Sequence, residues 1–367
     1  MNWITRSCFI AFWGAITSAL IAFLANKKQE VLSSPASYIL DGSTQRLISH
    51  PTRTADTTAI ILNWSRFPNV IQIVENLCQQ TDDFAECPEN RLKITNSVSN
   101  LYFQARFFGC AEAETEFCYI QDDDYIVLPE IIRALRVRMR KSTSAIYLLP
   151  PHEMLSSELK RIRVGESIHT SFAWLGHGSI MRPGRAQEFL ALLKYLNTSD
   201  EEMQMADNYY SVLGNVYPEV WFDQGIELGG GIAFTQGVEG EERNNRHIFQ
   251  AAKYLDTIMT CESPPCTGKS VPFVSFERQA PPSGHRAPCV GFPCLLETTV
   301  SLLPATQIDV ESTTHMLKIE RHHRESLKET DTNDYLLHPP SHAVDGKPET
   351  AFCLPRGTFV DPYRIRV

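Results

Sequence analysis

Three consecutive carboxylates, Asp122 to Asp124, stand in the stretch CYIQDDDYIV between two apolar runs. Adjacent like charges repel each other, most strongly where water is scarce, so we expect a positive partner near them. Carboxylate oxygens are the ligands that hard divalent cations prefer, and such a cation can hold a diphosphate. The triplet is therefore a candidate metal and nucleotide site. The alternative is an ordinary acidic turn at the end of a strand.

Polar residues also follow the first apolar run of the globular part, in NWSRFPN. We expect Asn63 and Arg66 to contact the base, ribose or pyrophosphate of a nucleotide, because a guanidinium suits charge-assisted bonds to phosphate. Asn100 and Arg106 precede the triplet, and we expect them on one helix, about one and a half turns apart, facing the same cleft. The alternatives are a loop that leads into a helix and ordinary surface positions.

Trp174, Gly176 and His177 come together in SFAWLGHGSIM. Glycine lets the backbone approach a ligand closely, and an aromatic ring suits stacking on a sugar face. This stretch is a candidate sugar-binding loop, and a hydrophobic hairpin with glycine turns is the alternative.

Asp207 lies among apolar residues in DEEMQMADNYYSVLGN, whose apolar spacing predicts one helix. A carboxylate is costly in such surroundings unless it is paired or functional. The alternative is a bond from Asp207 to a neighbouring backbone group alone.

Arg243, Arg246 and His247 end the polar segment EGEERNNRH and precede an amphipathic helix. A mobile basic loop can close over a diphosphate and exclude water, and we expect this segment to be such a loop. A structural role for the lone histidine is the alternative.

Strands and helices must bring these residues together. Apolar and β-branched runs predict strands, and apolar residues at helical spacing predict helices between them. This alternation predicts an α/β fold with a mainly parallel central sheet flanked by helices, and ligands at the carboxyl ends of the strands. The predicted order is strand TTAIILNWSR, helix FPNVIQIVENLCQQ, strand RLKITN, helix NLYFQARFFGCAEA and strand EFCYIQDDD.

In this order AIILNWSRFPNVIQIVENL, NSVSNLYFQARF and CYIQDDDYIVLPEII resemble the GT-A glycosyltransferases, most closely the exostosin-like (family 64-like) transferase domain and its fungal relatives. The resemblance spans residues 57–260 and implies a Rossmann-like GT-A fold. It implies that Asp122 and Asp123 lie by the ribose and that Asp124, with Asp122 beside it, binds Mn²⁺ or Mg²⁺. A histidine, here His247, would complete the metal shell.

The same resemblance implies an acidic residue at the reaction centre, here Asp207. In an inverting enzyme it would take the proton of the acceptor hydroxyl, and in a retaining enzyme it would position or stabilise the oxocarbenium-like state. For the loop of Trp174 to His177 the resemblance suggests contact with the acceptor or the donor sugar.

The predicted function is a metal-dependent glycosyltransferase that moves a sugar from a nucleoside-diphosphate sugar, a UDP-sugar first, to a glycan, protein or lipid acceptor. A catalytically inactive, membrane-tethered carbohydrate-binding or scaffold subunit is the alternative. A hydrolase fits less well, because its two carboxylates must face each other across a bond. The net charge of −9 argues against a nucleic-acid partner.

Residues 7–25 carry no charge and are long enough to cross a membrane as a helix, with a cleaved signal peptide as the alternative. We therefore expect a single-pass type II membrane protein of the Golgi or endoplasmic reticulum, with its catalytic domain in the lumen. The predicted parts are a tail and transmembrane anchor at 1–28, a stem at 29–56, the transferase domain at 57–260, a Pro- and Cys-rich linker or irregular extension at 261–335, and a truncated segment at 336–367 that resembles the start of discoidin-like, galactose-binding modules.

Cysteine usage fits an oxidising lumen. Four pairs close in sequence are candidate disulfides, although sequence alone leaves their connectivity open: Cys78/Cys87, Cys110/Cys118, Cys261/Cys266 and Cys289/Cys294. Of two N-glycosylation sequons, NTS at Asn197 is expected on a surface loop, and NWS at Asn63 is expected in a strand, buried and unmodified.

Overall fold

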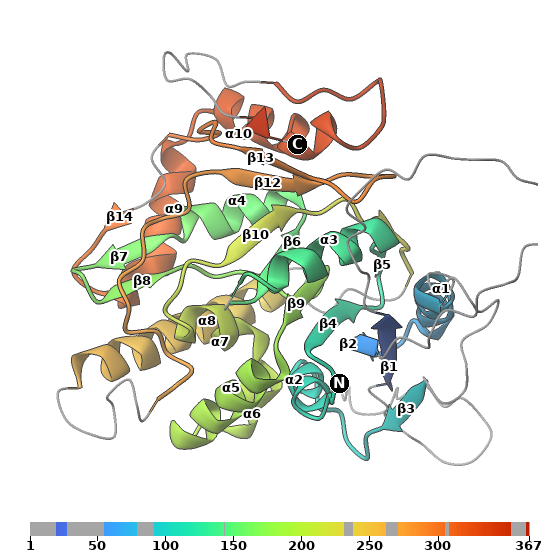
Figure 1. Ribbon diagram of the computed structural model, residues 1–367. Coiled ribbons are helices and arrows are strands. Elements are labelled where there is room, and N and C mark those ends of the chain that lie inside the picture. Colours follow the sequence, from blue (N-terminus) through green and yellow to red (C-terminus); the bar gives the residue numbers. More distant parts are fainter. Residues whose placement is uncertain are drawn as a thin grey trace, which may run out of the picture.

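The computed structural model describes the backbone of residues 20–27 and 365–366 and, in between, residues 55–78, 92–142, 144–230, 238–261, 271–304 and 308–353. Its centre is one twisted sheet (Figure 1). From one edge to the other the strands are β15 (Ile365–Arg366), β13 (Leu295–Thr298), β12 (His285–Pro288), β10 (Glu219–Phe222), β6 (Ile146–Leu149), β9 (Ser179–Met181), β4 (Phe117–Asp122), β2 (Ala55–Asn63), β1 (Leu20–Lys27) and β3 (Lys93–Asn96).

The middle of this sheet is mainly parallel, as the sequence predicts. β2 pairs in parallel with β4, and β10 pairs in parallel with both β6 and β12. β9 lies between β4 and β6 and is antiparallel to both, so β4 and β6 point the same way. The carboxyl ends of β2, β4, β6 and β10 therefore lie along one edge of the sheet.

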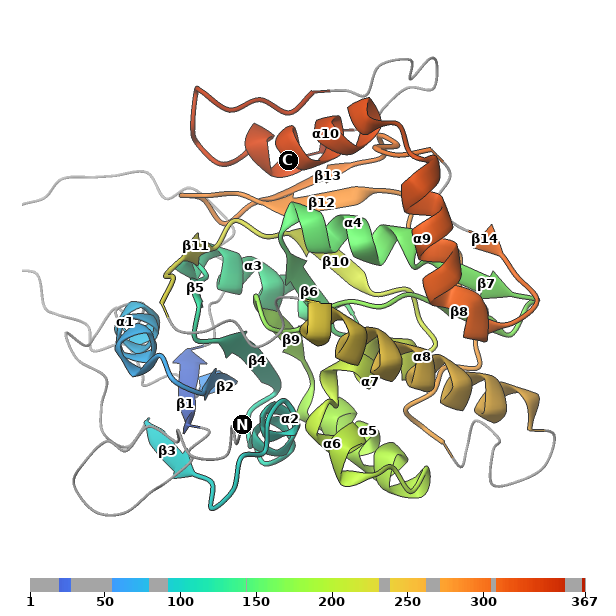
Figure 2. The same cartoon turned by 180° about the vertical axis from the view of Figure 1, so that it is seen from behind.

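Helices cover both faces of the sheet (Figures 1 and 2). On β4, Phe117 and Tyr119 pack into one core with α1 and α3, whereas Cys118 and Ile120 pack into the other with α2, α5, α7 and α8. Burial on both sides explains why this strand has an unbroken apolar sequence. The helices are α1 (Phe67–Cys78), α2 (Gln104–Ala111), α3 (Pro129–Met139), α4 (Pro151–Leu159), α5 (Pro183–Tyr195), α6 (Asp200–Gln204), α7 (Asp207–Leu213), α8 (Val238–Thr260), α9 (Met316–Ser326) and α10 (Glu329–Leu337).

Short elements complete the fold. β5 (Tyr125–Ile126) pairs with β11 (Ile226–Glu227), and β7 (Ile162–Val164) pairs with both β8 (Ile168–Thr170) and β14 (Ile308–Asp309). Two 3-10 helices lie at Thr313–His315 and Pro340–Ala343.

The C-terminal third belongs to the same body. β12 and β13 lie in the part of the chain that was predicted to be a linker or extension. They extend the main sheet, since β12 pairs in parallel with β10 and β13 pairs antiparallel with β12. In the last predicted part, residues 336–367, the described residues form the end of α10, a 3-10 helix and the edge strand β15. No galactose-binding sandwich is present among these described residues.

Three helix predictions need correction. Asn100 lies ahead of α2 and not on it, since Tyr102 has a positive φ of 49° and the helix starts at Gln104. The single helix predicted around Asp207 is divided into α6 and α7 at Met205, whose ψ of 28° leaves the helical range. The segment predicted as a mobile basic loop is helical, because α8 already begins at Val238.

The predicted membrane anchor falls mostly on residues 1–19, which lie outside the described residues. Its last part differs from the prediction, because Leu20–Lys27 forms β1, which pairs antiparallel with β2 and β3. Among the described helices, none combines the length and the apolar character that crossing a membrane requires.

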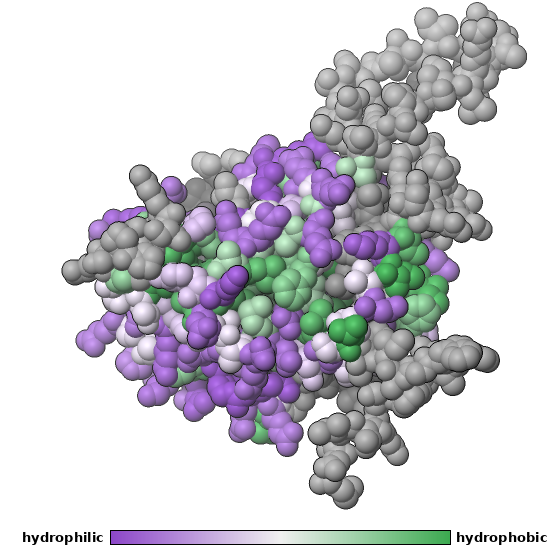
Figure 3. All heavy atoms as spheres, turned by 90° about the horizontal axis from the view of Figure 1, so that it is seen from below, coloured by the Kyte–Doolittle hydropathy of each residue, from purple (hydrophilic) through white to green (hydrophobic). Residues whose placement is uncertain are grey.

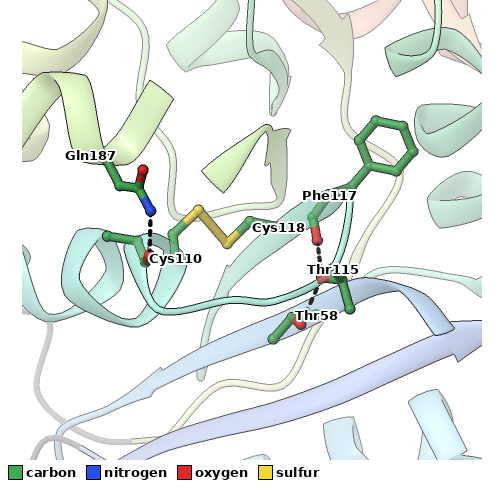
Figure 4. The surroundings of a disulfide bond; sticks show 7 residues. Thr58, Cys110, Thr115, Phe117, Cys118 and Gln187 are labelled. Atoms are coloured by element: carbon green, nitrogen blue, oxygen red, sulfur yellow. Dashed lines mark hydrogen bonds between the residues drawn. A yellow bond between two sulfur atoms is a disulfide. The ribbon is translucent and has the colours of Figure 1, made fainter. Parts of the chain in front are cut away.

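Two of the predicted disulfides are present, Cys110–Cys118 and Cys289–Cys294. The first joins the end of α2 to the start of β4 beneath Gln187 of α5, which donates a hydrogen bond to the carbonyl of Ala111 (Figure 4). Cys78 and Cys261 are also disulfide-bonded. Their predicted partners, Cys87 and Cys266, lie outside the described residues.

We predict that replacing both Cys110 and Cys118 by alanine lowers the free energy of unfolding by about 2–3 kcal/mol, since the bond closes a short loop and both side chains are buried. Urea unfolding of the double variant measures this loss. Cys353→Ala is the matched control, because Cys353 is an exposed free cysteine. Equal stability of the double variant and the control would contradict the prediction.

Candidate functional site

Charged side chains collect at the carboxyl edge of the sheet. The acidic triplet ends β4, and Arg66 follows β2. Asp223 comes directly after β10, and Glu153 lies in the first turn of α4, the helix that follows β6. The sheet thus brings together residues that lie far apart along the chain.

Arg66 binds two members of the triplet. Its guanidinium lies 2.9 Å from Asp123 and 3.3 Å from Asp124. The backbone N–H of Trp64 donates to the other Asp123 oxygen at 3.2 Å, and Asn63 accepts a hydrogen bond from the backbone N–H of Arg66. The residues of the β2 exit for which the sequence predicts nucleotide contacts therefore lie against the triplet.

Arg106 binds Asp122, the remaining member of the triplet. Its side chain is fully buried in α2 and donates to Asp122 at 2.7 Å and to Asp207 at 2.6 Å. Arg66 and Arg106, which the sequence predicted as nucleotide-binding residues, are thus ion-paired with the triplet, whereas the positive partner expected from the sequence was a divalent cation. Arg106 also brings Asp207, from α7, into contact with the triplet.

Two carboxylates share the one buried guanidinium of Arg106, which leaves negative charge in excess. Burial raises the pKa of Asp207 to about 6, although Arg106 opposes this shift. Burial also raises the pKa of Asp122 and Asp124, against the opposing effects of Arg106 and Arg66. Such shifts are typical of a site that is completed by a cation or a proton.

His177 lies among a second set of carboxylates. Its Nε2 is 3.1 Å from Glu153 and its Nδ1 is 3.8 Å from Asp223. Burial alone would lower the pKa of His177, but Glu153, Asp223 and Asp124 outweigh it and raise the pKa to about 9. The imidazole is therefore a cation at neutral pH.

The sequence analysis missed Asp223 and Glu153. Asp223 follows the apolar strand EVWF just as the triplet follows its own strand, and that shared pattern was a usable signal. It also missed an aromatic pair: the half-exposed ring of Trp64 stacks on Tyr102 with ring centroids 6.1 Å apart. This pair borders the loop of Asn100, whose side chain accepts the Tyr102 N–H.

Gly176 leaves no room for a side chain unless Asp122 moves. A Cβ at this position would run into the carboxylate of Asp122, and the Asp122 backbone N–H already donates to the Gly176 carbonyl at 2.8 Å. Trp174 of the same loop packs edge-on against Phe172 and is partly buried. The loop therefore approaches the triplet through its glycine and histidine.

Of the three predicted residues on α8, His247 and Arg246 pair with residues outside the triplet. His247 is buried, hydrogen-bonds to Tyr209 at 2.8 Å and lies 3.5 Å from Glu201. Arg246 pairs with Glu201 at 2.5 Å on the surface, and Arg243 lies in the same helix. Burial lowers the pKa of His247. The metal-ligand role of His247 and the lid role of the arginines stay predictions from the sequence.

A divalent cation has donors here. Asp124 is about one-third exposed, and Asp122, whose other oxygen binds Arg106, is 26% exposed. Among the described residues, no three histidines, cysteines or carboxylates are grouped as a complete protein metal site. Magnesium-type sites often use one or two carboxylates and take their remaining ligands from water and substrate phosphates. Asp122 and Asp124 fit that kind of site.

No protein-family model, curated protein or solved structure matches this chain.

We predict that Gly176→Ala lowers the free energy of unfolding by about 1–3 kcal/mol, because the methyl group forces Asp122 away. Thermal unfolding measures the loss. Gly184→Ala is the matched control: nothing lies near its would-be Cβ, and alanine favours the first turn of α5. The prediction fails if the two variants are equally stable.

Burial raises the pKa of Asp223 from 3.8 to about 6. The folded chain therefore keeps a proton that the unfolded chain releases, and this group destabilises the fold increasingly as pH rises from about 4 to about 6. We predict that Asp223→Asn gains about 1–3 kcal/mol of stability relative to the unmodified chain over that range and no more above it.

Urea unfolding at several pH values tests this. Asp200→Asn is the control variant, because it makes the same chemical change at an exposed residue at the start of α6. A pH-independent difference for Asp223→Asn would overturn the assignment of this proton.

Proposed function

We propose that the chain is a glycosyltransferase that uses a nucleoside-diphosphate sugar with Mn²⁺ or Mg²⁺. The observation that carries the proposal is a surplus of carboxylates where the parallel strands end. Among the residues that the structure describes, six carboxylates face three cations there, so a further cation is favoured. The six are Asp122, Asp123, Asp124, Glu153, Asp207 and Asp223, and the three are Arg66, Arg106 and His177.

Asp122 and Asp124 would hold the metal ion, which supplies positive charge to the departing nucleoside diphosphate. Arg66 is the group that must move for this to happen. It would leave Asp124 and turn its guanidinium to a phosphate oxygen, while Asp123 would keep the Trp64 N–H as a partner. This exchange of partners would couple donor binding to metal binding.

The aromatic pair of Trp64 and Tyr102 suits the base of the nucleotide, because a planar base stacks on an aromatic face. Asn100, next to this pair, has a buried side-chain nitrogen with no hydrogen-bond partner within the described part of the chain. A ribose hydroxyl or a base carbonyl would supply that acceptor. These contacts would favour a nucleotide over a free phosphate.

Asp207 would orient Arg106 and act at the transferred sugar. One of its oxygens binds Arg106, and the other is buried with no hydrogen-bond partner in the described residues. Because Asp207 is only 2% exposed, contact with a sugar requires this second oxygen to become accessible when substrate binds. The cationic His177, near Asp124, would add positive charge on the side of the loop.

The acceptor proposed is a glycan, protein or lipid in the secretory pathway, in the Golgi or endoplasmic reticulum. The disulfides Cys110–Cys118 and Cys289–Cys294 support an oxidising compartment. Attachment to the membrane through residues 1–28, as a type II protein, is proposed from the sequence alone.

One observation favours a catalytically inactive carbohydrate-binding or scaffold subunit instead. Arg66 and Arg106 already neutralise part of the triplet, so its carboxylates have a structural use without metal. The two functions differ in whether UDP binding requires the metal and whether a donor sugar is cleaved.

We predict that UDP binds the full-length chain at least about tenfold more tightly with Mn²⁺ than without it, and that Asp124→Asn removes this gain by deleting a carboxylate charge. Isothermal titration measures both. Asp200→Asn is the control, since it makes the same chemical change on an exposed helix end. The proposal is wrong if the affinity for UDP changes neither with Mn²⁺ nor with Asp124→Asn.

A screen of UDP- and GDP-sugars for Mn²⁺-stimulated hydrolysis then separates the two candidate functions. Cleavage of one donor supports the transferase. Metal-dependent binding of UDP without cleavage of any donor supports the inactive subunit.

A further inference from the structure

Asn197 stands on the surface in the tight turn between α5 and α6. Its backbone has a φ of 51°, and its N–H donates to the Lys194 carbonyl at 3.1 Å, which ends α5. The residue is exposed, and within the described part of the chain its side-chain amide makes no hydrogen bond. Together with Thr198 and Ser199 it forms the sequence Asn-Thr-Ser. The amide nitrogen is thus free to carry a substituent.

A groove begins at this residue. Its volume is about 480 Å³, and α2, α5, α6 and the turn form its walls. Most of its surface is apolar, and Phe108 is exposed in it. Figure 3 looks from below at this end of the molecule, where hydrophobic patches interrupt a mainly hydrophilic surface. The lining residues are Phe108, Leu190, Ala191, Lys194, Asn197, Thr198 and Met203.

The second sequon, Asn63-Trp64-Ser65, has the opposite surroundings. Asn63 is 8% exposed, and its side-chain oxygen accepts the backbone N–H of Arg66 at 3.1 Å. A sugar on Asn63 would have to occupy the edge of the sheet beside the acidic triplet. Only one of the two sequons can carry a glycan in the folded chain.

We propose that Asn197 carries an N-linked glycan whose first sugars lie in the groove between α2, α5 and α6. In the modification, the Asn197 amide nitrogen bonds to the anomeric carbon of an oligosaccharide carried on a lipid diphosphate. The bond from that carbon to the diphosphate oxygen breaks, the lipid diphosphate leaves, and the amide gives up one proton.

The groove suits the two sugars nearest to asparagine. Its volume lies within the range of about 300–1,000 Å³ of small-ligand sites. The exposed ring of Phe108 and the apolar side chains of Leu190 and Met203 would contact the C–H faces of the sugars, and the Lys194 ammonium is placed to donate to hydroxyl groups. The glycan would cover apolar surface that the polypeptide leaves exposed.

Full-length chain made in a eukaryotic secretory host tests the attachment. We expect the amidase that hydrolyses the glycan–asparagine bond to remove one glycan and leave aspartate at position 197, which peptide mass spectrometry locates. Asn197→Gly should abolish glycosylation at this position without backbone strain, because glycine tolerates the positive φ. Ser199→Thr should keep it, since threonine preserves both the sequon and the hydroxyl that caps α6. A chain without glycan at 197, or with glycan at Asn63, overturns the proposal.

A second experiment tests whether the first sugars of the glycan lie in the groove. Release of the glycan from the native chain should be at least about fivefold slower than its release from chain unfolded in urea. Native variants of equal stability should differ in their release rates only through the groove. Phe108→Ser removes the ring that a sugar would stack on and should raise the native release rate to that of an exposed glycan. Phe292→Ser, at an exposed aromatic residue outside the groove, is the matched control and should leave the rate unchanged. Native release that is equally fast in all three proteins shows that the glycan does not lie in the groove.

Discussion

The buried guanidinium of Arg106 is the interaction on which the rest of the site depends. It joins the end of β4, through Asp122, to the first turn of α7, through Asp207. A fully buried cation is stable only with such partners, and removal of either carboxylate would change the charge of the whole cluster. Charge as well as apolar contact therefore holds α2, β4 and α7 together.

The sheet turns this pairing into a site. Parallel strands end at the same edge, so the residues after β2, β4 and β10 converge there without any long-range sequence signal. β9 is antiparallel to its neighbours, and the loop that leads into it carries Gly176 and His177 to the same edge from the opposite direction. The absence of a side chain at Gly176 is what allows that loop to approach the triplet.

Local sequence patterns predicted the parts of the fold that local forces determine. β2, α1, β3, α2 and β4 follow apolar runs and helical spacing closely. For the triplet the sequence predicted a divalent cation, and for Arg66 and Arg106 it predicted nucleotide contacts. The ion pair of Arg106 with Asp207 was not predicted, because the two residues lie 101 positions apart and composition does not encode their pairing. Pro- and Gly-rich composition concealed β12 and β13, whose strand conformation depends on pairing with the sheet. The polar sequence around His247 predicted a loop, but the segment is helical, and His247 is buried there with a hydrogen bond to Tyr209.

The disulfide Cys110–Cys118 has a place in this network that its position along the chain makes clear. Cys110 follows Arg106 by one helical turn, and Cys118 precedes Asp122 by four residues of the same strand. The covalent link and the salt bridge between Arg106 and Asp122 thus join the same helix to the same strand. Reduction of the disulfide would therefore remove a covalent tie between α2 and β4 beside the acidic triplet.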